Sequence, residues 1–101
     1  MIRVMVTYTV KPDRVEENEG LVRAVYDGLR KIGDPGIHYA TFKLDDGKTF
    51  VHVALLDSEE KQAVLSGSPA FKAFQAELKD RCEVPPKPQK LTEIGSYQLP
   101  A

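Results

Sequence analysis

The chain has few of the residues that most directly specify a chemical function. Its 101 residues include no tryptophan, two histidines and a single cysteine. One cysteine cannot form an internal disulfide, which fits a reducing cytoplasm, and the two histidines and one cysteine do not have the spacing of a metal site. A Gly-rich phosphate loop and a Ser-His-Asp pattern are also absent. The sequence therefore predicts no metal and no cofactor.

Neither charge nor hydrophobic length indicates a nucleic-acid or membrane partner. The 14 basic and 15 acidic residues give a formal net charge of -1. There is no basic stripe with interleaved aromatics, so we expect no nucleic-acid partner. No apolar run approaches the roughly 20 residues of a membrane span, and the first residues carry a strand pattern without a signal-peptide pattern. We expect a cytoplasmic protein.

The segment from Gly36 to Leu56 predicts a β-hairpin. Asp46-Gly47 is a preferred pair for a two-residue turn in which both residues have positive φ. If Asp45 and Lys48 close this turn, one face is apolar apart from a histidine: His38, Ala40, Phe42, Leu44, Val51, Val53 and Leu55. The other face is mixed: Ile37, Tyr39, Thr41, Lys43, Phe50, His52, Ala54 and Leu56. A slip of one residue would exchange the faces of one strand.

The remaining segments predict two further strands and three helices. Alternating apolar residues predict a strand over 2–10. A helix runs from a capping box of Asp13 and Glu16 to about Ile32, where Gly33 ends it in the left-handed conformation. After the hairpin, the pattern predicts helices at 58–65 and 69–82, an extended connector at 83–88 and a last strand at about 90–99.

This order, β-α-β-β-α-β, is the ferredoxin-like arrangement. Right-handed crossovers place the helices on one face of a four-stranded antiparallel sheet, and 101 residues support a single α+β domain over 1–101. We expect the helices to cover the hairpin face that carries His38. The opposite face would carry Met5, Tyr39, Phe50, Ala54, Leu56 and Ile94. That apolar area leads us to expect a homodimer packed sheet to sheet.

Several segments resemble the antibiotic-biosynthesis-monooxygenase family of dimeric α/β barrels. They are Val10-Lys11-Pro12-Asp13, Gly36 with Phe50-Val51-His52-Val53, Asp57-Ser58-Glu59-Glu60, and Leu65-Ser66-Gly67-Ser68-Pro69-Ala70-Phe71-Lys72-Ala73-Phe74. The resemblance implies a homodimer whose two sheets form a barrel, and a small-molecule cavity between helices and sheet. Some members of this family oxidise aromatic compounds without metal or flavin, while relatives degrade haem, isomerise lactones or have no known activity.

Departures from the family narrow this resemblance. Leu65 stands near a place where the family often has a histidine. The haem-degrading branch uses an asparagine on its first strand and a tryptophan late in its third, and neither is present here. These absences speak against haem oxygenation. A second set of segments resembles an uncharacterised bacterial subgroup, which implies no further chemistry: Glu17-Asn18-Glu19, Phe50-Val51-His52, Phe74-Gln75, Arg81-Cys82-Glu83 and Pro85-Pro86.

His52 and Asn18 are the candidate catalytic residues. An imidazole could remove a proton from a phenol or from a carbon next to a carbonyl, and the alternative is a histidine hydrogen-bonded across the dimer interface. The Asn18 amide could hold a substrate oxygen, and the alternative is a satisfied buried amide. The expected cavity lining is Tyr8, Tyr26, His38, Phe71 and Phe74, all of which could instead be ordinary core or partly exposed side chains.

Two functional hypotheses follow, with a third between them. The first is a cofactor-independent monooxygenase acting on an aromatic or enolisable substrate, with His52 as base. The second is a non-catalytic homodimeric protein that binds a small aromatic ligand in the same cavity. An isomerase or cyclase on this fold is the third, and consumption of O₂ separates it from the first.

Overall fold

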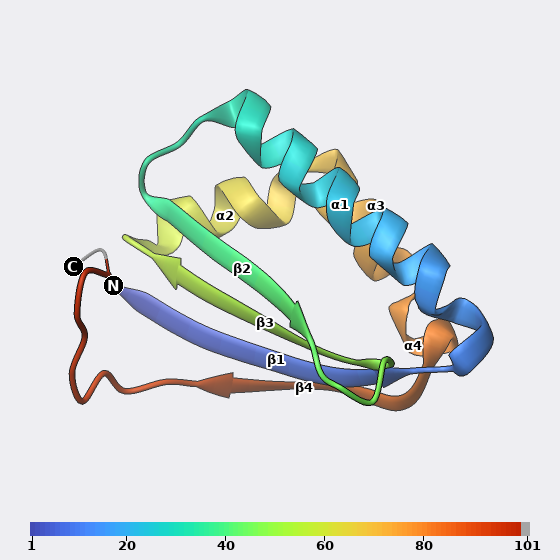
Figure 1. Cartoon of the computed structure of the whole chain (residues 1–101). Coiled ribbons are helices and arrows are strands. Elements are labelled where there is room, and N and C mark those ends of the chain that lie inside the picture. Colours follow the sequence, from blue (N-terminus) through green and yellow to red (C-terminus); the bar gives the residue numbers. More distant parts are fainter. Residues whose placement is uncertain (100–101) are drawn as a thin grey trace.

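The computed structural model describes residues 1–99. They form a sheet of four antiparallel strands with all of the helices on one face, followed by an irregular C-terminal segment (Figure 1). The elements are β1 (Ile2–Val10), a 3₁₀ turn (Pro12–Arg14), α1 (Val15–Ile32), β2 (Ile37–Lys43), β3 (Thr49–Leu56), α2 (Glu59–Gly67), α3 (Pro69–Ala76), α4 (Leu78–Arg81) and β4 (Cys82–Lys90). The strand order is β2-β3-β1-β4. This confirms the expected ferredoxin-like α+β fold.

The hairpin has the expected register but presents its other face to the helices. Lys43 lies opposite Phe50, as the sequence predicts. β1 places Val6 opposite His52, and its alternate residues enter the core below the helices. The expectation that the helices cover the face of His38 is therefore wrong, and Phe50 lies in the core rather than on the open face. The mixed face can be buried because its polar side chains hydrogen-bond to one another.

The hairpin presents its more uniformly apolar side to the open face of the sheet. All helices of the described residues lie on the opposite side (Figure 1). The apolar residues of the open face are Met5 of β1, Ala40 and Phe42 of β2, and Val51, Val53 and Leu55 of β3, while β1 adds the polar residues Arg3, Thr7 and Thr9. Most of these side chains are half-buried by their neighbours in the sheet, and Phe42 is 58% exposed.

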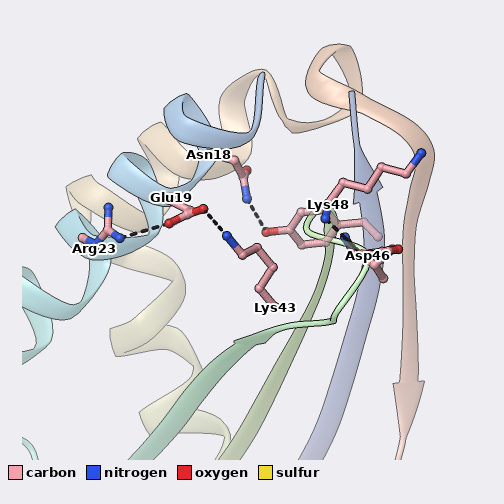
Figure 2. A network of polar contacts seen from close by, with 8 residues as sticks. Asn18, Glu19, Arg23, Lys43, Asp46 and Lys48 are labelled. Atoms are coloured by element: carbon pink, nitrogen blue, oxygen red, sulfur yellow. Dashed lines mark hydrogen bonds and ion pairs between the residues drawn. The ribbon is translucent and has the colours of Figure 1, made fainter. Parts of the chain in front are cut away.

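The hairpin turn differs from the expected two-residue type. Gly47 has a φ of 76°, whereas Asp46 does not have a positive φ. Leu44 donates its N–H to the Thr49 carbonyl and accepts a hydrogen bond from the Gly47 N–H. The Asp46 carboxylate accepts hydrogen bonds from the backbone N–H groups of Lys48 and Thr49, and these bonds hold the loop in its conformation (Figure 2). The four-residue loop is symmetric about the expected turn, so the register is unchanged.

The start of α1 is also built differently. No side chain caps it, and the predicted capping box of Asp13 and Glu16 is wrong, because the 3₁₀ turn at Pro12–Arg14 includes Asp13 and α1 begins only at Val15. At the other end, Gly33 has a φ of 63° and donates its N–H to the Leu29 carbonyl. The predicted left-handed cap is therefore confirmed.

The last third of the chain corrects the predicted last strand. The helix expected over 69–82 breaks at Glu77, and the strand is Cys82–Lys90 rather than about 90–99. Three prolines lie within this strand: Pro85, Pro86 and Pro88. They are tolerated because β4 is an edge strand that pairs only with β1, and its register shifts between Thr7 and Val10. Residues 91–99 follow without helix or strand, and Ile94 is 96% exposed.

Gly20 within α1 and Gly33, which caps its end, should respond to alanine substitution in opposite ways. Gly33→Ala should lower the free energy of unfolding by about 1 kcal/mol, because a side chain disfavours positive φ. Gly20→Ala, at an exposed position of α1 with open space around its Cα, should raise it by about 0.5–1 kcal/mol. Urea unfolding followed by circular dichroism measures both. Changes of the same sign in the two variants would contradict the helix boundary.

Candidate functional site

A cavity of about 400 Å³ lies between the sheet and the helices α2 and α3. Alternate residues of each strand point toward the helices, so all four strands contribute to it. Its walls include Val4, Val6 and Tyr8 of β1, Tyr39 of β2, His52, Ala54 and Leu56 of β3, Leu65 of α2, Phe71 and Phe74 of α3, Leu78 of α4 and Pro86 of β4. Exposed polar residues line the remaining edge: Gln62, Ser66, Gln75 and Lys79. The cavity is therefore apolar inside with a polar margin.

His52 is the centre of the polar part of this cavity. Its Nε2 lies 2.7 Å from the Tyr8 hydroxyl oxygen. Its Nδ1 lies 2.7 Å from the Tyr39 hydroxyl oxygen and 3.1 Å from the hydroxyl oxygen of Thr41. These hydroxyls come from β1 and β2, the two strands beside β3. Both ring nitrogens thus have hydroxyl partners within the protein.

Burial keeps this cluster neutral. His52 is 4% exposed, and desolvation lowers its pKa from 6.5 to about 4. The imidazole is therefore uncharged at pH 7. Burial raises the pKa of the Tyr8 and Tyr39 hydroxyls, so both keep their protons. The arrangement can exchange hydrogen bonds with the oxygen of a ligand without carrying a charge itself.

Asn18 and Arg81 lie behind Tyr8 and are completely enclosed. Asn18 is 0% exposed, and its Nδ2 donates to the Tyr8 hydroxyl oxygen at 3.0 Å. Figure 2 shows this amide pointing from α1 toward the sheet. Arg81 is 1% exposed and donates from Nε to the Asn18 Oδ1 at 3.2 Å and from Nη2 to the Phe74 carbonyl at 2.7 Å. Among residues 1–99 no carboxylate forms an ion pair with this guanidinium.

Aromatic rings surround the hydroxyls. The His52 ring stacks on Tyr8 with centroids 5.3 Å apart, and Phe74 lies 5.3 Å from His52. Phe71 meets Tyr39 edge-on at 6.4 Å. Such rings present faces and edges that favour contact with another flat ring. A planar aromatic molecule in the cavity would therefore meet ring surfaces and hydroxyl groups together.

The structure brings most of the predicted site residues together. His52, Tyr8, Phe71 and Phe74 all line the cavity. Asn18 does not line it and acts only through Tyr8.

Two of the predicted lining residues lie elsewhere. Tyr26 lines a separate, smaller hollow of about 250 Å³, where its hydroxyl lies 2.6 Å from the Thr41 hydroxyl. His38 lies opposite Leu55 on the open face of the sheet, so its expected place in the cavity is wrong. The reason is the inverted assignment of the two hairpin faces.

The predicted cavity lining did not include three members of the cluster. Tyr39 and Thr41 lie on one side of β2, with His38 and Ala40 on the other, and the side of Tyr39 was expected from the sequence to be open. Arg81 gave no signal, because an arginine near a helix end is normally exposed. The exposed charges nearby form ordinary surface pairs, such as Glu19 with Lys43 at 2.8 Å and with Arg23 at 3.0 Å (Figure 2). These pairs contribute little to stability.

Residues 1–99 contain neither a metal-binding cluster nor a helix suited to a membrane. No cluster of three or more histidine, cysteine, aspartate or glutamate side chains is placed to hold a metal ion. None of the helices in this part of the chain combines the length and hydrophobicity that a membrane span requires.

Solved structures with the same architecture identify the fold. A mutant of SnoaB, a cofactor-independent oxygenase from Streptomyces nogalater, is 13% identical over 97% of each chain with a TM-score of 0.72. Rv0793 from Mycobacterium tuberculosis is 19% identical over 94% of this chain and 96% of its own, with a TM-score of 0.78. The structure of an antibiotic biosynthesis monooxygenase also has a TM-score of 0.78, at 13% identity, over 94% of this chain and 100% of its own.

This chain has the fold of the antibiotic biosynthesis monooxygenases. The resemblance inferred from the sequence segments is thereby confirmed at the level of the antibiotic biosynthesis monooxygenase fold. No family model and no curated protein sequence matches the chain. At the identities found, the likeness leaves the activity to be argued from the site itself.

The buried imidazole predicts how stability depends on pH. The pKa of His52 is about 4 in the folded chain and near 6.5 when unfolded, so between these values the unfolded state binds the extra proton. The free energy of unfolding should therefore fall as pH decreases from 6.5 toward 4, by about 3 kcal/mol from this residue. Urea unfolding at several pH values measures the slope.

The matched variants isolate the contribution of His52. His52→Gln should flatten the pH dependence between 6.5 and 4, while His38→Gln, the same change on the open face, should keep it. An unchanged slope in His52→Gln would show that the imidazole is already protonated, or never buried, in the folded protein.

Proposed function

We propose that this protein binds a planar aromatic, enolisable small molecule in the cavity and catalyses its oxygenation by O₂ without a cofactor. The observation that carries the proposal is the neutral cluster of His52, Tyr8 and Tyr39 in the wall of an aromatic-lined cavity. The likeness to SnoaB, a cofactor-independent oxygenase, supports it at the level of the fold.

The cavity supplies the conditions that such a reaction needs. A ring-lined space of about 400 Å³ accommodates a small fused-ring compound. Burial alone disfavours an anion, as it does for the Tyr8 and Tyr39 phenols, so the enolate form of a bound ketone needs a hydrogen-bond donor at its oxygen. The Tyr39 hydroxyl lines the cavity and can supply such a donor.

The reaction balances without a further reductant. A ring CH₂ conjugated with an aromatic ketone loses a proton to give an enolate, which transfers electrons to O₂ and, on regaining the proton, forms a hydroperoxide at carbon. Loss of water from the hydroperoxide leaves a carbonyl. One molecule of O₂ thus converts the CH₂ group into C=O and yields one molecule of water, with the substrate carbon oxidised and O₂ reduced.

His52 is the side chain placed to influence the proton transfer. Its pKa of about 4 makes it a weak base, and both of its ring nitrogens are hydrogen-bonded to hydroxyls. A developing enolate beside it would raise that pKa by electrostatic attraction. The role of His52 as base thus remains a prediction, which substitution tests.

The hydrogen-bonded histidine and the aromatic cavity also favour a second function. A histidine that is fully hydrogen-bonded by its own protein serves well as a fixed binding surface. A non-catalytic protein that binds an aromatic ligand would use the cavity unchanged and would consume no O₂. An isomerase or cyclase would alter the ligand, also without consuming O₂.

Oxygen consumption separates these functions. With anthrone, a planar ketone with an enolisable CH₂, the protein should accelerate O₂ uptake and form the corresponding quinone. His52→Gln should lower the rate above buffer background by roughly 100-fold, the usual contribution of a proton-transferring side chain. An oxygen electrode gives the rate, and mass spectrometry with ¹⁸O₂ shows one labelled oxygen in the product.

The controls make the outcome decisive. His38→Gln should retain the full rate, because His38 lies on the other face of the sheet. Binding of anthrone without O₂ uptake above background would contradict the oxygenase and support the non-catalytic function. Full activity in His52→Gln would show that this residue is not the base.

We also propose that two copies of the chain pack through the open face of the sheet. The support is the row of apolar side chains on that face, including Met5 opposite Val53, which no helix of the described residues covers. A sheet face meets an identical copy with self-complementary contacts around a two-fold axis. The family resemblance implies the same homodimer.

A charge at the centre of this face should disrupt the dimer. The protein should sediment as a dimer at micromolar concentration, and Val53→Asp should sediment as a folded monomer, because the dimer would bury an unpaired carboxylate on each copy. Ala63→Asp on the exposed side of α2 is the control and should remain dimeric. A stable wild-type monomer in analytical ultracentrifugation would rule the interface out.

A further inference from the structure

The buried hydrogen bonds around His52 have one consistent direction, and Arg81 sets it. A guanidinium has donors and no acceptor, so the Asn18 atom within 3.2 Å of Arg81 Nε must be the amide oxygen. The Asn18 NH₂ group then faces the Tyr8 hydroxyl oxygen, 3.0 Å away, and donates to it. Arg81 thereby fixes an amide orientation that would otherwise be free to flip.

This orientation determines which nitrogen of His52 carries the proton. Tyr8 is 1% exposed and its hydroxyl oxygen already accepts from Asn18, so the hydroxyl hydrogen needs an acceptor. Among the described residues the acceptor within reach is His52 Nε2, at 2.7 Å. A neutral imidazole with an accepting Nε2 has its proton on Nδ1.

The protonated Nδ1 of His52 also sets the direction of the hydrogen bonds made by the two hydroxyls on β2. A protonated Nδ1 donates to the oxygens at 2.7 and 3.1 Å, those of Tyr39 and Thr41, so neither hydroxyl donates back to it. The Thr41 hydrogen has the Tyr26 oxygen at 2.6 Å as its acceptor. The Tyr39 hydrogen has no acceptor among the described residues, and Tyr39 lines the cavity.

We propose that the chain Arg81–Asn18–Tyr8–His52–Tyr39 makes the Tyr39 hydroxyl a dedicated hydrogen-bond donor to a carbonyl or enolate oxygen of the ligand. Tyr39 is the residue that touches the ligand, and Arg81 and Asn18 are positioning residues that act through the intervening groups. Each bond in such a chain polarises the next in the same sense. The buried guanidinium, without a carboxylate partner, adds a positive charge at the far end.

The donor role of Tyr39 narrows the class of ligand for the proposed function. It rests on that function in one respect, that the ligand is aromatic. A flat ring system with an acceptor oxygen on its edge fits the site, whereas a ligand whose only polar group is a cation does not. An oxygen that gains negative charge would be held more tightly than a neutral carbonyl, because hydrogen bonds to charged acceptors are stronger.

Nitrogen NMR tests the direction of the chain. Wild-type protein with ¹⁵N-labelled histidine should show the Nδ1–H tautomer of His52 at pH 7. Asn18→Asp changes one atom and should reverse the chain: the new carboxylate pairs with Arg81 and accepts from Tyr8, so His52 must donate from Nε2. The Nε2–H tautomer in wild-type protein, or the same tautomer in both proteins, would overturn the proposal.

A pair of probes tests the donor itself. Fluorenone and fluorene share one planar ring frame, and fluorenone adds a carbonyl that cannot enolise. Tyr39→Phe should weaken fluorenone binding by roughly fivefold, the value of one ordinary hydrogen bond, and leave fluorene binding unchanged. Asn18→Asp should weaken fluorenone binding to a similar extent. Equal losses for both probes, or no loss for fluorenone, would overturn the donor role.

These probes keep the inference separate from the oxygenase proposal. Neither probe undergoes the oxygenation proposed for anthrone, so their binding is independent of catalysis. A fluorenone preference that depends on Tyr39, found together with no O₂ uptake on anthrone, would support the donor and refute the oxygenase.

Arg81→Met tests the positioning role of the guanidinium. Circular dichroism checks that the variant is folded, and its His52 should then be a mixture of both tautomers. A single Nδ1–H form would exclude Arg81 as the positioning residue.

Discussion

The hydrogen bond between Tyr8 and His52 is the interaction on which the rest of this structure depends. It joins β1 to β3 inside the core, 2.7 Å long and closed to solvent. Without it, the Tyr8 hydroxyl hydrogen and the His52 Nε2 would each be buried without a partner, at a cost of about 1–3 kcal/mol for each unsatisfied group. Because the bond exists, the mixed face of the hairpin can lie under the helices, and the more apolar face is left open.

The same constraint shapes the cavity. The hydroxyls and the imidazole satisfy one another along the sheet, and Phe71 and Phe74 cover them from α3. The result is a neutral polar cluster in an otherwise apolar space, where a ligand oxygen meets few competing waters. Arg81 is joined to this cluster through Asn18 and Tyr8, and its guanidinium also lies over the Phe74 ring. The proposed recognition of an aromatic oxygen compound and the burial of the histidine thus depend on one network.

Sequence reasoning was most successful where the information is local. The alternation of 2–10, the Asp-Gly turn and the glycine after Ile32 predicted the first strand, the hairpin register and the end of α1. It failed at the last strand, because prolines usually exclude a strand and an edge position removes that objection. It also failed for the faces of the hairpin, because hydrophobicity favours the apolar face as the core and cannot show that polar side chains will pair.

The sequence by itself determined the element order, the ferredoxin-like fold, the register of the hairpin and four lining residues of the cavity. Tertiary structure alone decided which face is buried, and with it the places of His38, Tyr39 and Thr41. It also decided that Arg81, 63 residues from Asn18, closes the network behind the cavity. The physical reason is that a buried polar group is acceptable only with its partner, and here those partners come from strands and helices far apart in the chain.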